Sequence, residues 1–495
     1  MLVPRLRWLR SDTFLLGALL VATLGVRLWT LRTPDLGGDA AFKWFFLRSW
    51  AAENPWVFDH HTARFSINVP AWLALRLFGS HPNVMYVAPL AAALAQVPLL
   101  YGVGRALGLR WAGLLACLLL LVFEPMADAA SQFLPGIFQA TYLLGALHAV
   151  VRFDCERRRR WAIAAGIWLF AAYLAMVTTV YVLPGFVLAL WLPRRRSGDV
   201  AWALGAFAVL WAVETAGYAL WSKYPFGQFQ LILSTHTDVK PITFWGLFER
   251  YAALPPDWQL VLALWIVSAA TLLPLRHRTR PAAWALWLFP ASLLLGMTFG
   301  VKHLDPLIPA TDFSVRYCDM LMPMIALCLA TAACTALQPL ARRSAPGRAG
   351  VLLTAASLAG IAGVALAAAR LYQLPSGHAL VINQDQWQTL NDAYARGLPI
   401  VAGNRDNHFQ MKALVCIQWA YLRDELIRVD GTLVVRRQGK TRAGARSHRY
   451  LTRDDQRPEA VAQAIRRHRC MLAATRVQNE PKLELRVYDG PECPR

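Results

Sequence analysis

The first polar segment of the chain holds an aspartate, Asp39, which follows two glycines shortly after the first long apolar run. An aromatic, amphipathic stretch that contains Lys43 continues to residue 50. This pattern is typical of a helix lying in the membrane interface, with Asp39 at its N-terminal end. Asp39 can serve there as the N-cap of the helix or as a general base, and the two roles are compatible.

Basic side chains gather further along the same segment. His60, His61 and Arg64 precede Pro70 and a Leu-Phe-Gly sequence that ends at Gly79. The planar guanidinium of an arginine offers paired donors to phosphate oxygens, so this group suits a phosphate at the membrane surface. The alternative is a set of solvated interfacial side chains that bind no ligand.

A second acidic pair, Glu124 and Asp128, lies where the third apolar run ends. Ionisable groups at that depth are costly, which makes them functional candidates, and two residues four apart share one face of a helix. A later polar connector carries Lys302 and His303, and Arg316 stands before another long apolar run. A positive charge there either meets a lipid phosphate or anchors the helix end.

Long apolar runs must position these side chains. The chain has 495 residues, of which 56% are hydrophobic, and the runs are close to the roughly 20 residues that a helix needs to cross a bilayer. We expect a polytopic α-helical membrane protein with about 11 transmembrane helices. The runs lie at 13–31, 83–103, 111–126, 132–151, 161–176, 179–192, 200–221, 259–275, 281–299, 317–337 and 350–371. Two short runs meet at Thr178 and Thr179, where a single tilted helix is the alternative.

The formal net charge of +21 arises largely from arginine clusters between the apolar runs. Such clusters are typical topology signals, and they place the connectors at 157–160 and 194–196 in the cytoplasm. The N-terminus is then cytoplasmic and the tail lies outside, which in a bacterium is the periplasmic side of the inner membrane. The long segments 32–82, 222–258 and 372–495 are all outer segments, so we expect function on the outer face.

The tail differs in composition from the rest of the chain. Strand-like runs at 398–402, 432–436 and 483–488 alternate with helical patterns such as 458–468. We expect a transmembrane domain over 1–371, which includes the outer loop 32–82, and a small soluble periplasmic α/β domain over 372–495. Cys416 and Cys470 either form a disulfide or stay free. No Cys or Cys/His set has metal-ligand spacing, so the sequence does not indicate a divalent metal.

The order of these features resembles the GT-C superfamily of glycosyltransferases, in particular the glycosyltransferase family 39 type with protein mannosyltransferases and aminoarabinose transferases. The resemblance covers nearly all of the membrane part. The residues that carry it are Asp39, then His60, His61, Arg64, Pro70, Phe78 and Gly79, and finally Arg316, Tyr317 and Pro323. Two departures are visible: the family's acidic doublet is Gly-Gly-Asp39-Ala here, and its Lys-Pro-Pro is Thr-Ala-Arg64.

The resemblance implies an inverting transfer of a sugar from a polyprenyl-phosphate donor, at the outer membrane face, to a glycan, lipid or protein acceptor. In that family a loop carboxylate is the base, a second acid sits at the next outer turn, and basic side chains grip the donor phosphate. By match, Asp39 is the base and Asp128 or Glu124 is the second acid, while Arg64 and Arg316 grip the phosphate. The further basic candidates are Lys43, His60, His61, Lys302 and His303. No cofactor and no nucleic acid partner is implied.

Two other classes of function remain open. A transporter or flippase of lipid-linked saccharides would also need many helices and basic groups, and it would keep polar residues or broken helices near the bilayer midplane. Glu214 and the Pro184-Gly185 break are the candidates for such features. A membrane scaffold whose outer tail binds a partner is the third class.

Overall fold

The computed structural model describes most of the membrane part of the chain and, in the tail, the strands. The described residues are 12–31, 43, 47, 63–79, 82–193, 197–221, 226–230, 241–272, 281–310, 319–343, 400–402, 425–429, 432–436, 449–451, 470–476 and 483–489. The chain forms two compact units. Among the described residues, the larger unit contains 12–31, 63–67 and those from 89 to 343. The smaller unit contains 43, 47, 68–88 and the strands of the tail.

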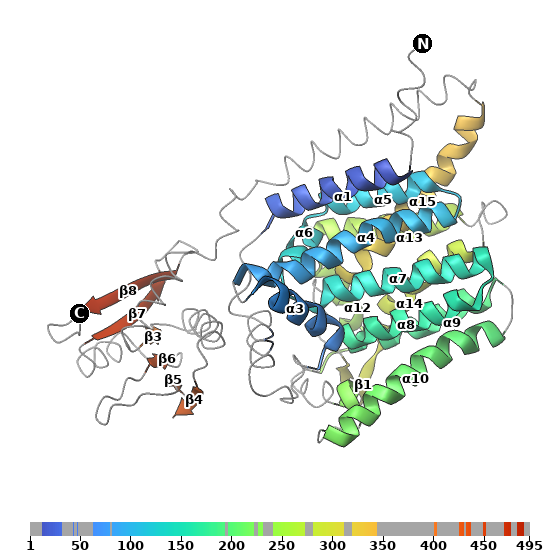
Figure 1. Ribbon diagram of the computed structural model, residues 1–495. Coiled ribbons are helices and arrows are strands. Elements are labelled where there is room, and N and C mark those ends of the chain that lie inside the picture. The colour runs from blue at the N-terminus through green and yellow to red at the C-terminus, as the bar shows by residue number, and fades with distance from the viewer. Residues whose placement is uncertain are drawn as a thin grey trace, which may run out of the picture. The chain divides into compact units, whose positions relative to one another are not determined.

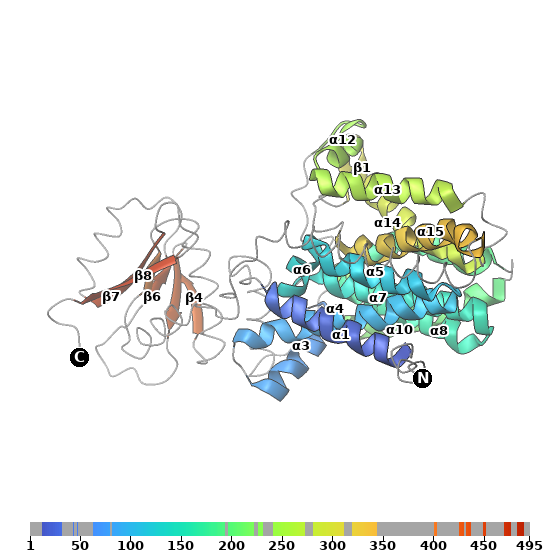
Figure 2. The same ribbon diagram turned by 90° about the horizontal axis from the view of Figure 1, so that it is seen from above.

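Helices make up most of the larger unit, and they lie side by side as a bundle with roughly aligned axes (Figures 1 and 2). The helices of the described residues are α1 (Asp12–Trp29), α3 (Phe65–Phe78), η3 (Pro82–Tyr86), α4 (Val87–Ala106), α5 (Arg110–Val122), α6 (Glu124–Ser131), α7 (Pro135–Glu156), α8 (Arg159–Ala175), η4 (Val177–Val182), α9 (Leu183–Trp191), α10 (Ser197–Trp221), α12 (Gly246–Ala252), α13 (Pro256–Leu272), η6 (Pro281–Trp284), α14 (Ala285–Phe299), η8 (Asp319–Leu321) and α15 (Met322–Arg343).

Helix α1 buries its polar side and exposes its apolar side. Its buried residues are Thr23 and Arg27, whereas Val21 is 73% exposed and Trp29 60% exposed. Exposing such a surface to water would cost roughly 25 cal/mol for each Å², so the surface faces lipid. Three of the described helices are long and apolar enough to cross a membrane, namely Asp12–Trp29, Val84–Ala106 and Ser197–Leu220. The chain is therefore a membrane protein.

The helices follow the apolar runs that the sequence indicated. Each predicted run up to 317–337 overlaps a helix, whereas the run at 350–371 lies outside the described residues, so the total number of spans stays a prediction. The predicted end of the run at 111–126 is wrong. Helix α5 stops at Val122 because Phe123 is extended, with φ −82° and ψ 109°, and Pro125 stands in the first turn of the separate helix α6.

Helices α8 and α10 run in the same direction. The guanidinium of Arg159, in the first turn of α8, lies 5.3 Å from the ring of Trp202 near the start of α10, and Phe170 meets Phe207 further along both helices at 5.8 Å. Gly166 allows this approach, because a Cβ there would overlap the backbone oxygen of Ala203. The segment between the two helices must therefore return across the bundle.

The return segment is η4 followed by α9, and it runs antiparallel to α14. The carbonyl of Tyr181 accepts a hydrogen bond from the Ser292 hydroxyl at 2.6 Å, and Phe186 meets Phe289 with ring centroids 5.9 Å apart. The amide of Gln139 on α7 donates to Thr179 Oγ1 at 2.8 Å and holds the turn. The prediction of two short segments that meet at Thr178 and Thr179 is confirmed, and the single tilted helix is excluded.

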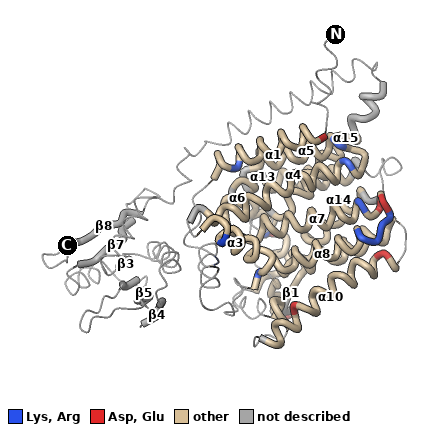
Figure 3. Tube along the Cα trace, viewed as in Figure 1, with Lys and Arg blue, Asp and Glu red and all other residues tan. Residues whose placement is uncertain are grey.

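Several charged residues gather at the end of the bundle where α1 begins (Figure 3). The Asp12 carboxylate accepts a hydrogen bond of 2.5 Å from Tyr101 and pairs with Arg105 at 3.0 Å and Arg110 at 3.7 Å. We call this the basic end, defined by Arg105, Arg110 and residues 157–160. The opposite end, which carries α6, is the α6 end.

The connector between α7 and α8 is built around Glu156 at the basic end. The indole N–H of Trp161 donates to this carboxylate at 2.7 Å, and Arg152 and Arg160 form ion pairs with it. The hydrogen bond from Trp161 and the two guanidinium charges lower the pKa of Glu156. These contacts order the arginine-rich connector.

Strands occur in both units. In the larger unit, β1 (Val301–Leu304) and β2 (Leu307–Pro309) form an antiparallel hairpin after α14. In the smaller unit, β3 (Ile400–Ala402) pairs in parallel with β7 (Cys470–Arg476), which pairs antiparallel with β8 (Leu483–Asp489). A second antiparallel sheet joins β4 (Glu425–Val429), β5 (Thr432–Arg436) and β6 (Arg449–Leu451). Strands β3, β5 and β8 overlap the three predicted strand runs, while the helical run 458–468 and Cys416 lie outside the described residues.

Candidate functional site

The structure describes some of the predicted site residues and not others. The predicted residues outside the described ranges are Asp39, His60, His61 and Arg316. The predicted residues with a described backbone alone are Glu124 and Asp128, four residues apart in α6, and Lys302 and His303, both in β1. Lys43 and Arg64 are buried, with exposed fractions of 0% and 6%.

The described candidates of the larger unit share the α6 end of the bundle. Arg64 lies next to Phe65, whose ring contacts Tyr218 in the last turn of α10. Hairpin β1–β2 follows the end of α14, where the hydroxyls of Tyr251 and Thr298 are hydrogen-bonded. Helix α6 lies beside η8, which begins three residues after Arg316. The fold therefore brings Arg64, α6 and β1 to the end opposite the basic end.

Arg64 is held in place by contacts of the residues around it. The Tyr142 hydroxyl on α7 donates a hydrogen bond of 2.6 Å to the Ser66 carbonyl, and the Phe65 ring lies 6.2 Å from the Tyr218 ring on α10. The segment is thus fixed to α7 on one side and to α10 on the other. A guanidinium that is only 6% exposed is costly to bury, and such a charge at one end of a helix bundle in a membrane protein is a candidate for anion binding.

Helix α6 is anchored from the side of α1. The Arg27 guanidinium, 3% exposed, donates a hydrogen bond of 2.6 Å to the carbonyl of Leu120 in the last turn of α5. A cation suits this position, because the carbonyls at a helix C-terminus carry partial negative charge. Trp258 packs edge-on against Phe123, with ring centroids 5.1 Å apart. Both contacts fix the junction from which α6 starts.

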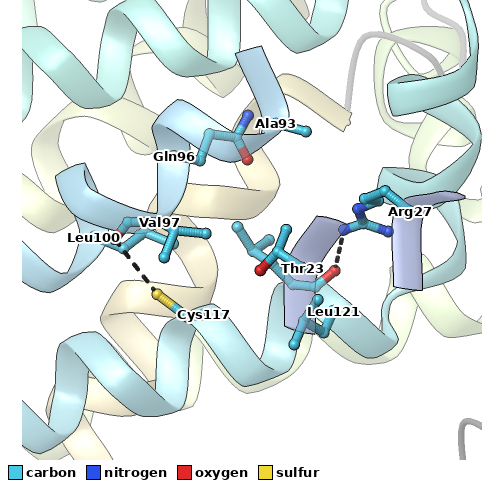
Figure 4. A pocket seen from close by; sticks show the side chains of 9 residues that line it. Thr23, Arg27, Ala93, Gln96, Val97, Leu100, Cys117 and Leu121 are labelled. Atoms are coloured by element: carbon cyan, nitrogen blue, oxygen red, sulfur yellow. Dashed lines mark hydrogen bonds between the residues drawn. The ribbon is translucent and has the colours of Figure 1, made fainter. Parts of the chain in front are cut away.

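A small pocket lies beside Arg27, between α1, α4 and α5 (Figure 4). Thr23 and Gln96 supply polar groups to its wall, and the Cys117 thiol donates to the Val97 carbonyl at 3.6 Å. The nine residues that line it are Thr23, Arg27, Ala93, Gln96, Val97, Leu100, Cys117, Leu120 and Leu121. The pocket thus lies at the contact between α1 and the core, where Arg27 links α1 to α5.

A polar cluster that sequence reasoning did not place in the site is formed by Tyr173, Glu214, Tyr218 and Gln228, here called the Glu214 cluster. The backbone N–H of Gln228 donates to Glu214 Oε1 at 3.4 Å, and the Gln228 amide donates to the carbonyl of Leu174 at 3.4 Å. Gln228 is fully buried, and both tyrosines are 2% exposed. In the sequence, this cluster was signalled by the carboxylate of Glu214 within an apolar run. Its neighbours on α8 and after α10 could not be read from the sequence, because tertiary packing brings them together.

The position of Glu214 tests the transporter alternative, which expects polar residues near the bilayer midplane. Glu214 is bound by Gln228, which belongs to the connector after α10, so the carboxylate lies toward the α6 end and not at the middle of the bundle. Gly185 has a packing role, because a Cβ there would overlap the Leu288 carbonyl of α14.

Within the described ranges, no group of three His, Cys, Asp or Glu side chains could hold a metal ion.

Residues 67–221 match the family model described as dolichyl-phosphate-mannose-protein mannosyltransferase. The match runs from α3 through α6 to the end of α10, and so includes Glu214. The resemblance to the GT-C glycosyltransferases is confirmed. No curated protein matches the chain.

Solved GT-C structures are similar to the chain at low identity. ArnT from Cupriavidus metallidurans, bound to undecaprenyl phosphate, is 15% identical with a TM-score of 0.47, over 84% of this chain and 88% of that one. The oligosaccharyltransferase from Archaeoglobus fulgidus, tethered to an acceptor peptide, is 12% identical with a TM-score of 0.48, over 82% and 63%. Arabinosyltransferase EmbB from Mycobacterium smegmatis is 16% identical with a TM-score of 0.44, over 68% and 31%.

Proposed function

We propose that the chain is an inverting membrane glycosyltransferase, which moves a sugar from a polyprenyl-phosphate donor to an acceptor at the outer, periplasmic face of a bacterial inner membrane. The observation that carries the proposal is the position of Arg64. It is buried, it is fixed to α7 and α10, and it shares the α6 end with the helix that bears Glu124 and Asp128. The family model, named for transfer from a dolichyl phosphate, supports a lipid-linked donor.

The proposed reaction needs a base at one place and a fixed positive charge at another. The acceptor hydroxyl attacks the anomeric carbon of the donor as a carboxylate takes up its proton, and the bond from that carbon to the phosphate oxygen breaks. Asp39 is the proposed base, with Asp128 or Glu124 as the second acid. The polyprenyl phosphate leaves as an anion, and Arg64 with Arg316 stabilises the charge that develops.

The remaining basic candidates have supporting roles in this proposal. Lys43, His60, His61, Lys302 and His303 are proposed to add positive charge around the donor phosphate. The orientation follows from the positive-inside rule, because the basic end carries the arginine-rich connector 157–160. Residues 372–495 are proposed as a soluble domain that shapes access of the acceptor. The sugar that is moved is a hexose or a pentose.

The experiment is transfer from radiolabelled polyprenyl-phosphate hexoses and pentoses in membranes that contain the protein. Asp39→Asn should lower turnover by about a hundredfold or more, because the amide cannot take up the proton, while expression stays normal because Asn caps a helix as well as Asp does. Asp154→Asn, at the basic end, is the matched control and should transfer at the wild-type rate.

Two results would contradict the proposed mechanism. A folded Asp39→Asn variant that transfers sugar at the wild-type rate shows that Asp39 is not the base, and attention then moves to Asp128→Asn and Glu124→Gln. If all three variants stay active, the carboxylate mechanism is wrong. Wild-type membranes that transfer no sugar from any of these donors would refute the proposed function itself.

A further inference from the structure

We propose that the Glu214 cluster binds the hydroxyl groups of the sugar that the donor carries, an inference that rests on the function proposed above. Its members come from three places in the chain: Tyr173 from α8, Glu214 and Tyr218 from α10, and Gln228 from the connector after α10. None of them was a predicted site residue of a transferase. The cluster would supply the sugar-recognition half of a site whose phosphate half is Arg64.

The cluster is built so that its polar groups converge. Gly227 has a φ of +64°, and a Cβ at that residue would lie 3.4 Å from Glu214 Oε1 and 3.3 Å from the Tyr218 ring. Glycine therefore lets the connector turn closely over the carboxylate. The Tyr218 ring lies against the same glycine, and Tyr173 directly precedes Leu174, whose carbonyl accepts the Gln228 amide. A carboxylate, an amide and two phenols thus gather in one place.

The cluster adjoins the segment that carries Arg64. Tyr218 contacts Phe65 with ring centroids 6.2 Å apart, and Phe65 follows Arg64 directly. Tyr218 also lies four residues after Glu214, so both face the same side of α10. A donor whose phosphate is held by Arg64 would therefore have its sugar within reach of Glu214, since a single aromatic contact separates the two groups.

Two acceptor atoms of the cluster are buried and unpaired within the part of the chain that the structure describes. Glu214 uses Oε1 for the Gln228 N–H, while Glu214 Oε2 and Gln228 Oε1 accept no hydrogen bond there. Buried acceptors without donors are costly, by about 1–3 kcal/mol for each atom. A purely structural role, holding the turn at Gly227, accounts for Oε1 and leaves the other two atoms unexplained.

The free atoms decide which chemical class of ligand fits. The free carboxylate oxygen of Glu214 and the amide oxygen of Gln228 are hydrogen-bond acceptors, so the ligand must bring donors. Sugar hydroxyls are donors, whereas a phosphate is an anion that only accepts and that a carboxylate repels. The cluster therefore suits the sugar and disfavours the phosphate, while the Arg64 guanidinium does the opposite. The Glu214 cluster would thus bind the sugar of the donor, and Arg64 would bind its phosphate.

The test separates recognition of the sugar from recognition of the phosphate. Glu214→Gln keeps an oxygen that accepts the Gln228 N–H, so the turn is preserved, but it removes the charge and replaces an acceptor by a donor. The probes are the radiolabelled donor that the wild type transfers and polyprenyl phosphate without a sugar, used as an inhibitor. We expect a KM for the donor that rises about tenfold or more and an unchanged inhibition constant for polyprenyl phosphate.

Three further variants accompany this test. Arg64→Ala should raise both the KM for the donor and the inhibition constant for polyprenyl phosphate, because both probes carry the phosphate. Glu249→Gln makes the same substitution at an exposed carboxylate of α12 and should change neither. Gln228→Ala removes the second free acceptor by another route, and it should raise the donor KM even if Glu214→Gln does not fold.

The inference is overturned if the Glu214→Gln donor KM stays at the wild-type value, or if the KM and the inhibition constant rise by the same factor. Both results presuppose a wild type that transfers sugar, so they refute the inference and leave the proposed function standing. A wild type that transfers nothing refutes the proposed function first, and this inference with it.

Discussion

Tyr142→Phe is the smallest change that tests whether the placement of Arg64 matters for donor binding. It removes one oxygen, the hydroxyl that donates to the Ser66 carbonyl at 2.6 Å. The ring itself stays supported, because it packs against Trp168 with centroids 5.9 Å apart. The arginine and its charge are unchanged. Any loss of donor affinity therefore measures how much the hydrogen bond to Ser66 contributes to the position of residues 63–67.

The size of the effect follows from the one bond that is lost. A neutral hydrogen bond of this kind contributes about 0.5–1.5 kcal/mol net, and each 1.4 kcal/mol is a factor of ten. We therefore expect the donor KM to rise by about twofold to about twelvefold. Arg64→Ala should cost more, about 2–5 kcal/mol, because it removes the charge that meets the phosphate. Arg64→Ala should therefore raise the donor KM more than Tyr142→Phe does.

Tyr101→Phe is the matched control for this assay. It also removes a phenol hydroxyl that makes a hydrogen bond, in this case to Asp12 Oδ1 at 2.5 Å. Its position at the basic end, opposite Arg64, should leave the KM for the donor unchanged. Transfer of radiolabelled sugar is measured for both variants across a range of donor concentrations, together with thermal stability in detergent.

Three outcomes would refute this reasoning. If Tyr142→Phe leaves the KM unchanged while Arg64→Ala raises it, the contact with Ser66 does not position Arg64. If Tyr142→Phe costs as much as Arg64→Ala, the tyrosine has a direct role that the structure does not account for. If Tyr101→Phe raises the KM equally, the effect is general destabilisation of the bundle.

The remaining predictions concern the packing and orientation of the bundle. Arg27→Met should lower stability by about 1.5–3 kcal/mol, since it removes a buried, charged hydrogen bond, and Arg27→Lys should restore part of the loss in a thermal unfolding assay. Gly166→Ala should destabilise by about 1–3 kcal/mol, because a methyl group would force α8 away from α10. Gly205→Ala, on the same pair of helices but with open space around it, should be neutral or stabilising in the same assay. A reporter fused after Arg495 should be active in the periplasm, and a cytoplasmic signal would contradict the proposed orientation.

The membrane helices could be predicted from the sequence because they depend on local composition. A run of about 20 apolar residues is favourable in lipid whatever lies around it, so each predicted run up to 317–337 overlaps a helix of the structure. The end of α5 was missed for a related reason. Hydropathy does not register the extended residue Phe123, which with Pro125 breaks one apolar run into α5 and α6.

The candidate site was predicted less completely than the helices. Arg64 was named from its residue type and its place in a predicted outer segment, but its burial and its attachment to Tyr142 depend on residues far away in the chain. Glu214 was noticed as a charge in an apolar run and assigned to a transport route. Its connection to Gln228 and Tyr218 changed that interpretation.

The sequence by itself determined which segments form apolar helices, which connectors are basic and which residue types could carry a transfer reaction. These properties follow from the free energy of moving single side chains between water and lipid, which is additive along the chain. The tertiary structure decided the direction of α9 and the neighbours of Glu214. Both depend on how closely two helices approach, as at Gly166 beside Ala203. Such an approach depends on complementary shapes of distant segments, and local composition does not encode it.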